Sequence, residues 1–467
     1  MGSNTRTNTI LLNTTIKKDA PTPKRFECNG GGSQQNLNTP LASPLKEWLF
    51  TIPCLLVSGI LTAAVYVGSC LWLLQLLGVP VLKRANRFCV MLLVGHILAA
   101  KTLFVKYFRR PKVVFVCYPP LRMWEHVEPM LRSVRWFWTE RQFVISDLAW
   151  DGKNVGCVCL IPPISTMADA PEKIQYHLNY CLNAFKGAKL ALAGQLPSVA
   201  RTLGVPAILH GDIVNGRVGT AALARRGVQK GIEVLRMRRP AKRPDGDLKL
   251  CILGGGGYTG VEISGACSGL FSEIYLVDKK YDGGSPHIMR REDGTVIMGT
   301  FDPCRVRTAD IVLVFLPNGE MVEPYVEYAH KDQVWIDDTH PPIPRALRDE
   351  LLKSSHLTRL TAVSNKMNMW PPLPSWKPQD LPGCLLTAVT VALSSKKTQE
   401  IKAGASLSEA KLGKAGVLEF IDLAEDMGVE MSIFPVENDD SFTTMGVQMD
   451  RMLVGNDDLD GKKNKGL

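Results

Sequence analysis

A glycine-rich segment at residues 254–260 carries the clearest chemical signal in the sequence. An apolar run at residues 248–253 leads directly into it, and a second apolar run at residues 261–270 follows. The glycines that fit the pattern G-x-G-x-x-G are Gly255, Gly257 and Gly260. Glycines at this spacing allow a tight turn and let backbone N–H groups approach a pyrophosphate at the start of a helix. The segment therefore predicts a dinucleotide-binding turn.

An acidic residue stands where the ribose of such a cofactor would lie. Residues 273–277 form another apolar run, which ends at Asp278, about twenty residues beyond the first motif glycine. A carboxylate there favours NADH, whereas Lys279 beside it could receive the 2′-phosphate of NADPH. The predicted cofactor is therefore NADPH or NADH, and the choice stays open. The predicted cofactor-binding residues are Gly254, Gly255, Gly257, Tyr258, Thr259, Gly260, Asp278, Lys279, Pro317 and Asn318.

Further apolar runs predict the elements that must position this turn. Residues 310–316 and 334–338 have the pattern of strands buried on both faces of a parallel sheet. Pro317 and Asn318 follow the first of these strands, at the edge where ligands bind in such sheets. The predicted fold class is α/β, with a Rossmann-type, doubly wound nucleotide-binding domain over residues 248–395.

Changes in composition predict how the rest of the chain is divided. Two alternating runs around Asp151 and Gly152 predict a hairpin in the domain that precedes the nucleotide-binding domain. The predicted segments are a disordered tail at 1–45, a membrane anchor of one or two hydrophobic helices at 46–112, a smaller N-terminal α/β substrate domain at 113–235, a basic linker at 236–247, a C-terminal helical segment at 396–436 and a disordered tail at 437–467.

An uncharged stretch at residues 48–82 predicts contact with a lipid bilayer. It holds no Asp, Glu, Lys, Arg or His, and it is longer than the roughly 20 apolar residues that a bilayer core requires. A second apolar stretch at residues 88–105 is shorter and contains His96 and Lys101. One membrane span and two spans both stay open, as does a second helix that lies on the membrane surface.

The positive charge of the chain is concentrated near its N-terminus. The first 112 residues carry a net charge of +11, and the whole chain carries +10, so the remaining residues together carry −1. The main body is thus not basic, and nucleic acid is not an expected partner. The 12 cysteines form no Cys-x-x-Cys pair, and no metal site is predicted. Scattered thiols favour a cytosolic catalytic body, and Lys463 and Lys465 resemble the retrieval signal of endoplasmic reticulum membrane proteins.

Four short segments carry a resemblance to a known family, and they are residues 194–198, 215–222, 336–341 and 383–388. Their residues and their order along the chain resemble the motifs of the long-chain acyl-ACP reductase family, whose members make fatty aldehydes from acyl thioesters. This family is distantly related to the glutamyl-tRNA reductase and shikimate dehydrogenase group. The similarity runs colinearly from about residue 137 to residue 434 and has no counterpart for the predicted anchor.

The resemblance implies that Cys384 accepts the acyl group. Residues 381–383 break the preceding structure, so Cys384 is expected at a helix start, where the helix dipole would lower the pKa of its thiol. His340 follows an apolar strand and is the candidate proton donor or thiol activator. The chain departs from the family pattern at Thr339, at His340 and at Thr387, so the reaction that the family catalyses does not carry over directly.

Three functions therefore stay open from the sequence. The first is a membrane-anchored reductase of the endoplasmic reticulum that reduces long-chain fatty acyl-CoA or acyl-ACP to a fatty aldehyde. The second is an NAD(P)-dependent dehydrogenase of a membrane lipid alcohol or ketone, in which Cys384 is structural. The third is a non-catalytic nucleotide-binding subunit that assists an aldehyde-consuming membrane enzyme.

Overall fold

A computed structural model describes most of the chain beyond residue 93. The described residues are 94–119, 121, 124, 125, 128, 142–167, 169–239, 247–284, 286–373, 376–394 and 413–436. Both predicted tails, residues 46–93 of the predicted anchor and most of the predicted linker lie outside them.

A five-stranded sheet with strand order β12-β2-β3-β1-β4 forms the first part of the fold. Its strands are β1 (Val113–Cys117), β2 (Phe143–Trp150), β3 (Lys153–Leu160), β4 (Lys189–Leu192) and β12 (Met367–Trp370). β2 and β3 pair antiparallel, as the sequence predicts. Asp151 and Gly152 between them both have positive φ, as a tight hairpin turn requires. The helices beside this sheet are η2 (Ile164–Thr166), α4 (Pro171–Ala184), α5 (Leu196–Thr202) and η3 (Pro206–Leu209).

Residues 94–104 are helical, continue into η1 (Val105–Arg109), and pack on the first sheet. Thr102 accepts a hydrogen bond from the backbone N–H of Val144 in β2 at 2.8 Å. Lys101 and Arg109 each form an ion pair with Asp147 of the same strand, at 3.1 and 2.9 Å. The described part of the second apolar stretch is therefore a helix of this domain. Among the described residues, we find no helix with the length and apolar character that crossing a bilayer demands.

A nine-stranded sheet forms the nucleotide-binding part, and its parallel strands have the order β8-β6-β5-β9-β10-β11. The strand order reverses between β5 and β9, as in a Rossmann-type doubly wound sheet. The parallel strands are β5 (Lys249–Leu253), β6 (Glu273–Val277), β8 (Val296–Thr300), β9 (Ile311–Val314), β10 (Val334–Asp337) and β11 (His356–Val363). Antiparallel strands at the edges are β7 (His287–Arg290), β13 (Asp380–Leu381) and β14 (Glu430–Pro435).

Helices cover both faces of this sheet. Successive residues of a strand point to opposite sides, and the strands are apolar at both sets of positions, so both faces must be buried. Leu250 and Ile252 of β5 join one buried cluster, and Cys251 and Leu253 join the other. The helices are α6 (Arg217–Arg238), α7 (Tyr258–Cys267), α11 (Gly383–Leu393) and α13 (Gly413–Asp426) on the first cluster's side, and α8 (Cys304–Thr308), η6 (Gly319–Val322), α9 (Glu323–Val326) and α10 (Arg345–Ser354) on the second. η5 (Lys279–Tyr281) follows β6.

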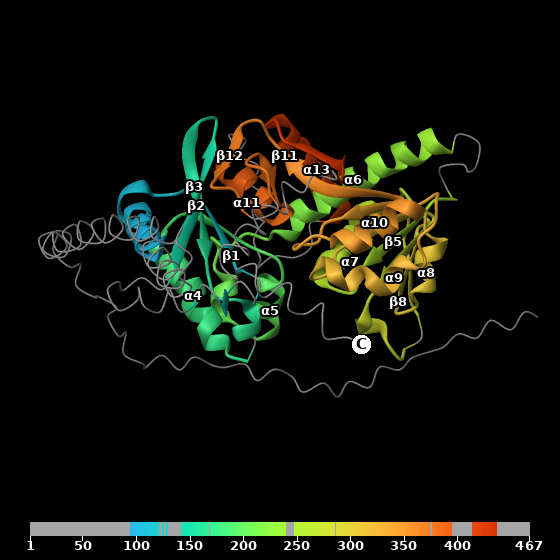
Figure 1. Cartoon of the computed structure of the whole chain (residues 1–467), viewed down its shortest axis with the longest axis horizontal. Coiled ribbons are helices and arrows are strands. Elements are labelled where there is room, and N and C mark those ends of the chain that lie inside the picture. Colours follow the sequence, from blue (N-terminus) through green and yellow to red (C-terminus); the bar gives the residue numbers. More distant parts are fainter. Residues whose placement is uncertain are drawn as a thin grey trace, which may run out of the picture. The chain divides into compact units, whose positions relative to one another are not determined.

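Three elements, α6, α11 and β12, pack across the boundary between the two predicted domains. α6 packs against α7, α11 and α13, and α11 also contacts β1 and β4 of the first sheet (Figure 1). β12 lies late in the chain but pairs with β2. The predicted helical segment at 396–436 is partly wrong, because its last residues form β14, which pairs antiparallel with β11. The alternating apolar residues Met431 and Ile433 suit that edge position.

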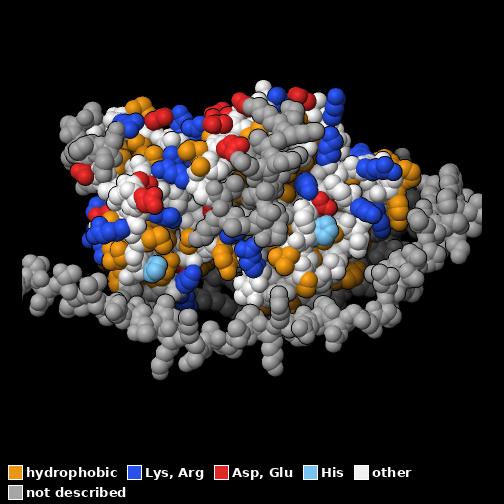
Figure 2. Space-filling model, turned by 180° about the vertical axis from the view of Figure 1, so that it is seen from behind, with side chains coloured by type: hydrophobic (Ala, Val, Ile, Leu, Met, Phe, Trp, Pro, Cys, Tyr) orange, Lys and Arg blue, Asp and Glu red, His pale blue; other side chains and the backbone are white. Residues whose placement is uncertain are grey.

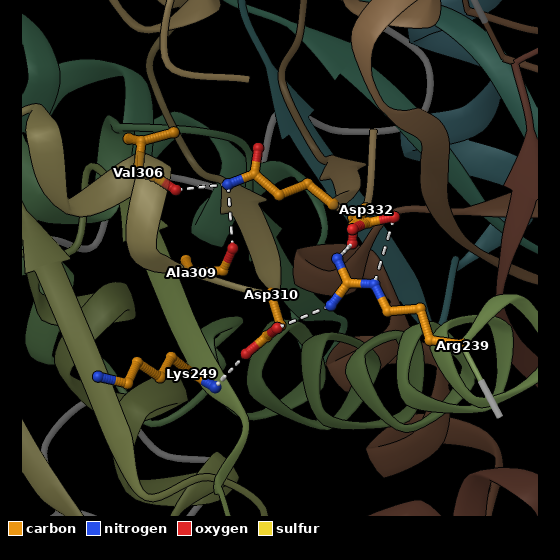
Figure 3. Close-up of polar contacts among 7 residues, drawn as sticks. Arg239, Lys249, Val306, Ala309, Asp310 and Asp332 are labelled. Carbon is orange, nitrogen blue, oxygen red and sulfur yellow. Dashed lines mark hydrogen bonds and ion pairs between the residues drawn. The ribbon is translucent and has the colours of Figure 1, made fainter. Parts of the chain in front are cut away.

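A buried ion pair ties the end of α6 to the start of the nucleotide-binding sheet (Figure 3). Arg239 contacts the carboxylate of Asp310 at 3.1 Å, and this carboxylate also accepts from the backbone N–H of Lys249 at 2.9 Å. Arg239 donates to the backbone carbonyl of Asp332 as well. Both side chains of the pair are mostly buried.

Replacing Asp310 with alanine should therefore leave Arg239 buried without its main counter-charge. We expect Asp310→Ala to lower the free energy of unfolding by about 3 kcal/mol, measured by urea titration. The matched control is Lys230→Gln, which removes an exposed ion pair with Glu233 and should change this free energy by less than about 0.5 kcal/mol. An equally small effect of Asp310→Ala would show that water replaces the pair.

Charged side chains of both signs are interspersed over the described part of the face in Figure 2. That face presents a mixed surface, in keeping with the nearly neutral charge that the sequence assigns to the main body.

Candidate functional site

The glycine-rich turn joins β5 to α7, and its glycines have different surroundings. Gly254 has a φ of +78°, and a Cβ there would lie 2.5 Å from the carbonyl oxygen of Phe315. A Cβ on Gly260 would lie 2.5 Å from the Cα of Gly255. These two positions need glycine for packing. A Cβ on Gly257 would meet only the carbonyl oxygen of Gly254, at 3.8 Å. The backbone at Gly257 is therefore open to close approach on the side where a Cβ would lie.

Asp278 lies directly against this turn. One carboxylate oxygen accepts from the backbone N–H of Gly256 at 3.0 Å, and the other accepts from the backbone N–H of Lys280 at 2.9 Å. The side chain of Lys280 donates to the carbonyl of Gly256 at 3.1 Å, whereas Lys279 is exposed on η5. The carboxylate is thus held in place, and its remaining lone pairs can accept from the hydroxyls of a ribose.

Asp278→Ala tests this role through the cofactor that it would recognise. The free 2′-hydroxyl of NADH needs an acceptor and the 2′-phosphate of NADPH does not, so we expect NADH affinity to fall about tenfold more than NADPH affinity. Fluorescence titration of both cofactors measures the difference. Asp282→Ala, four residues further on and exposed, is the control. Equal losses for both cofactors would make Asp278 a structural residue.

The predicted residues Pro317 and Asn318 follow β9 at the carboxyl edge of the sheet. The side chain of Asn318 accepts from the backbone N–H of Met321 at 3.2 Å and so begins η6. The next residue, Gly319, donates its backbone N–H to the carbonyl of Pro341 at 3.0 Å. The loops after β9 and β10 therefore meet beside the cofactor turn.

A small pocket of about 50 Å³ brings the sequence motifs together. It includes residues from the 194–198 loop, from the 215–222 segment, from the cofactor turn and from the start of α11. The lining residues are Leu192, Gly194, Pro197, Ser198, Arg201, Asn215, Gly216, Arg217, Thr220, Tyr258, Thr259 and Cys384. Segments that are far apart in the chain thus form one site, in which Cys384 faces the same space as Tyr258 and Thr259.

Close helix packing fixes Cys384 in this position. A Cβ on Gly216 would lie 2.9 Å from the Cα of Cys384, and a Cβ on Gly219 would lie 2.3 Å from the carbonyl oxygen of Gly383. Thr387, a departure from the family pattern, accepts a hydrogen bond from the backbone N–H of Gly219 at 2.9 Å. Small residues let α6 and α11 approach closely, and Thr387 holds the two helices in register.

The prediction that Cys384 has a lowered pKa is wrong. The protein around the half-buried thiol desolvates it, and this effect, followed by the charge of Asp338, raises the pKa of Cys384 to about 12. The backbone N–H groups of Gly194 and Leu385 act in the opposite direction but are weaker. At neutral pH the thiol is protonated, and a base must remove its proton before it can attack.

Asp338 is the acidic group that interacts with Cys384. Burial, and then the neighbouring charge of Asp337, raises the pKa of Asp338 well above its ordinary value. His340, the predicted activator, stacks on Trp376 with ring centroids 4.5 Å apart. The residue is partly exposed, but desolvation, followed by the charge of Arg359, lowers the pKa of His340. The imidazole is therefore neutral at pH 7. Within the described part of the chain, the charge that shifts the pKa of Cys384 is that of Asp338 and not of His340. Cys117 and Tyr118 also interact electrostatically with the Cys384 thiol.

Sequence reasoning missed three residues of this site. Arg201 and Arg217 line the pocket, but arginines near helix ends are common and gave no separate signal. Asp338 stands beside Asp337 at the end of an apolar strand, and this pair of acids was a usable signal. Among the described residues, no group of three or more His, Cys, Asp or Glu side chains could hold a metal ion.

Comparison with known proteins adds a distant likeness. No family model matches the chain, and no curated protein matches it either. Among solved structures, the chain is similar to shikimate 5-dehydrogenase from Listeria monocytogenes in complex with shikimate and NAD. The identity is 11%, over 54% of this chain and 86% of that chain, with a TM-score of 0.25. The Rossmann-type description rests on the strand order and the glycine turn themselves.

Proposed function

We propose that the protein is an NAD(P)H-dependent oxidoreductase that reduces an acyl thioester to an aldehyde through Cys384. The observation that carries the proposal is the shared pocket, whose lining includes Tyr258 and Thr259 of the cofactor turn together with Cys384. A hydride donor bound at the turn and an acyl group bound to the thiol would meet there. The open space beside Gly257 and the fixed carboxylate of Asp278 fit a dinucleotide.

The first step transfers the acyl group to the protein. The sulfur of Cys384 attacks the thioester carbon of acyl-CoA or acyl-ACP, and its proton passes to Asp338, which keeps it until the second step. The carbon–sulfur bond to the carrier breaks, and the carrier leaves as a thiolate that takes a proton from water. The backbone N–H groups of Gly194 and Leu385 interact with the sulfur and stabilise negative charge on it as the proton departs. One thioester is exchanged for another, so this step needs no reductant.

The second step forms the aldehyde. NADPH or NADH, when bound, supplies a hydride to the acyl carbon. The carbon–sulfur bond then breaks, the aldehyde leaves, and Cys384 regains a proton from Asp338. The close packing around Cys384 keeps the acyl carbon fixed during this exchange.

The test separates the two steps. The full-length protein is incubated with palmitoyl-CoA or succinyl-CoA without cofactor, and the adduct is mapped by mass spectrometry. We expect an acyl group on Cys384 that disappears, with aldehyde formation, when NADH or NADPH is added. Cofactor binding without any adduct would overturn the acyl-enzyme and leave two alternatives, a dehydrogenase in which Cys384 is structural and a non-catalytic nucleotide-binding subunit. Oxidation or reduction of the bound cofactor with a lipid alcohol or ketone would then favour the dehydrogenase. Absence of both adduct and cofactor binding would overturn the proposal.

A further inference from the structure

Two arginines from different helices meet at the cofactor turn. Arg201 comes from the last turn of α5, and Arg217 is the first residue of α6. The guanidinium carbon of each lies 5.6 Å from the centre of the Tyr258 ring. All three residues line the pocket that also contains Cys384. Two positive charges therefore face the space in which the acyl group would react.

The local structure holds these charges in place. Nε of Arg217 donates to the side-chain oxygen of Asn215 at 3.0 Å, which fixes the plane of the guanidinium. Burial, and then the charge of Arg201, lowers the pKa of Arg217. The carboxylate of Glu262 acts in the opposite direction on Arg217, and an anion bound between the two guanidinium groups would offset their mutual repulsion further. Planar guanidinium groups suit the two oxygens of a carboxylate or phosphate.

The size of the pocket limits which anion could bind there. The pocket is only about 50 Å³, so an anion at the arginines would lie a few bonds from a carbonyl on Cys384. The phosphate of a phosphopantetheine arm is separated from its thioester by a long chain of atoms and would lie elsewhere. The pyrophosphate of a bound cofactor would lie elsewhere, beside Gly257 at the start of α7, where a Cβ would meet only the carbonyl oxygen of Gly254.

We propose that Arg201 and Arg217, with the ring of Tyr258, bind a carboxylate or phosphate group of the substrate. This inference rests on the proposed function and names its substrate class. The acyl group is short and acidic, in place of the unsubstituted fatty chain that the sequence resemblance implies. Arg201 and Arg217 would select this substrate and orient its carbonyl towards Cys384.

Calorimetric titration of the full-length protein tests the inference with succinate and inorganic phosphate as probes. The protein is first saturated with NADH, so that the positions of the cofactor phosphates are filled. We expect at least one probe to bind this complex. Arg201→Gln and Arg217→Gln should each weaken that binding about tenfold or more, because each removes a charge-assisted contact. Arg217→Lys, which keeps the charge, should lose less.

The matched control lies on the same helix as Arg217. Arg226 pairs with Glu425 at 2.8 Å and is not among the residues that line this pocket, so Arg226→Gln should bind the probes like the unchanged protein. NADH affinity should change less than about twofold in each pocket variant.

Two results would overturn the inference. The first is that neither probe binds the NADH complex. The second is that Arg201→Gln and Arg217→Gln weaken NADH itself about tenfold or more, in which case the arginines hold the phosphates of the cofactor. Neither result affects whether Cys384 accepts an acyl group, so the proposed function is judged separately.

Discussion

Replacing Cys384 with serine is expected to abolish aldehyde formation, with a fall in kcat of about 10⁴-fold. The hydroxyl keeps the size of the residue, so the close packing against Gly216 should persist and the fold should be retained. Serine is a poorer nucleophile at this position, because its hydroxyl loses a proton much less readily than a thiol. NADH oxidation with acyl-CoA measures the loss, and NADH fluorescence titration shows whether cofactor affinity is kept.

The matched control for this substitution is Cys304→Ser. Cys304 is exposed and begins α8, on the opposite side of the nucleotide-binding sheet from α11. We expect this variant to keep most of its activity and to form the same acyl adduct. Aldehyde production by Cys384→Ser at a rate near that of the unchanged protein would rule out a covalent intermediate on this residue.

The dependence of acylation on pH reports which group takes the proton of Cys384. If Asp338 takes the proton, the acylation rate rises with pH only near the raised pKa of Asp338 and stays constant above it. The thiol itself does not contribute to this rise, because its own pKa is about 12. Asp338→Asn should lower the rate at pH 7 by about 100-fold. Its rate should then rise about tenfold per pH unit as the thiolate fraction grows. The same slope in the unchanged protein would exclude Asp338 as the acceptor.

The nucleotide-binding core could be predicted because its signals are local. β5, the glycine turn, α7 and β6 follow one another within about thirty residues, and each has its own apolar pattern. The turn also needs glycine at residue 254, where the structure has a positive φ. β12 and β14 gave no such signal. Each is a short edge strand whose partner lies elsewhere in the chain, so its position depends on tertiary packing.

The sequence predicts which segments line the site better than it predicts the chemistry of their side chains. The motifs around Gly194, Gly216 and Cys384 converge on one pocket, as colinear similarity to one family suggested. The predicted direction of the Cys384 pKa shift is wrong, because the dipole of α11 is only one of the influences on this thiol. Desolvation and the charge of Asp338 come from other elements and outweigh that dipole. Local sequence does not show which distant groups surround a side chain.

Gly257→Val is expected to remove cofactor binding from a folded protein. Gly257 has a φ of −73° and a ψ of 169°, which valine adopts without strain. The nearest atom to a Cβ there is 3.8 Å away, so the free energy of unfolding should change by less than about 1 kcal/mol. The valine methyl groups would occupy the space of the pyrophosphate, and NADH affinity should fall about 100-fold or more.

Gly260→Val, three residues further on, should instead lower the stability of the fold. Its Cβ would lie 2.5 Å from the Cα of Gly255, so strand and helix would have to separate, and stability should fall by about 3 kcal/mol. Gly284→Val, where a Cβ meets nothing within 4 Å, is the neutral control. Thermal unfolding and NADH titration of the three variants give the comparison. Unchanged NADH affinity in Gly257→Val would mean that the cofactor does not bind at this turn. The valine methyl groups would overlap any pyrophosphate that lay against the backbone of residue 257.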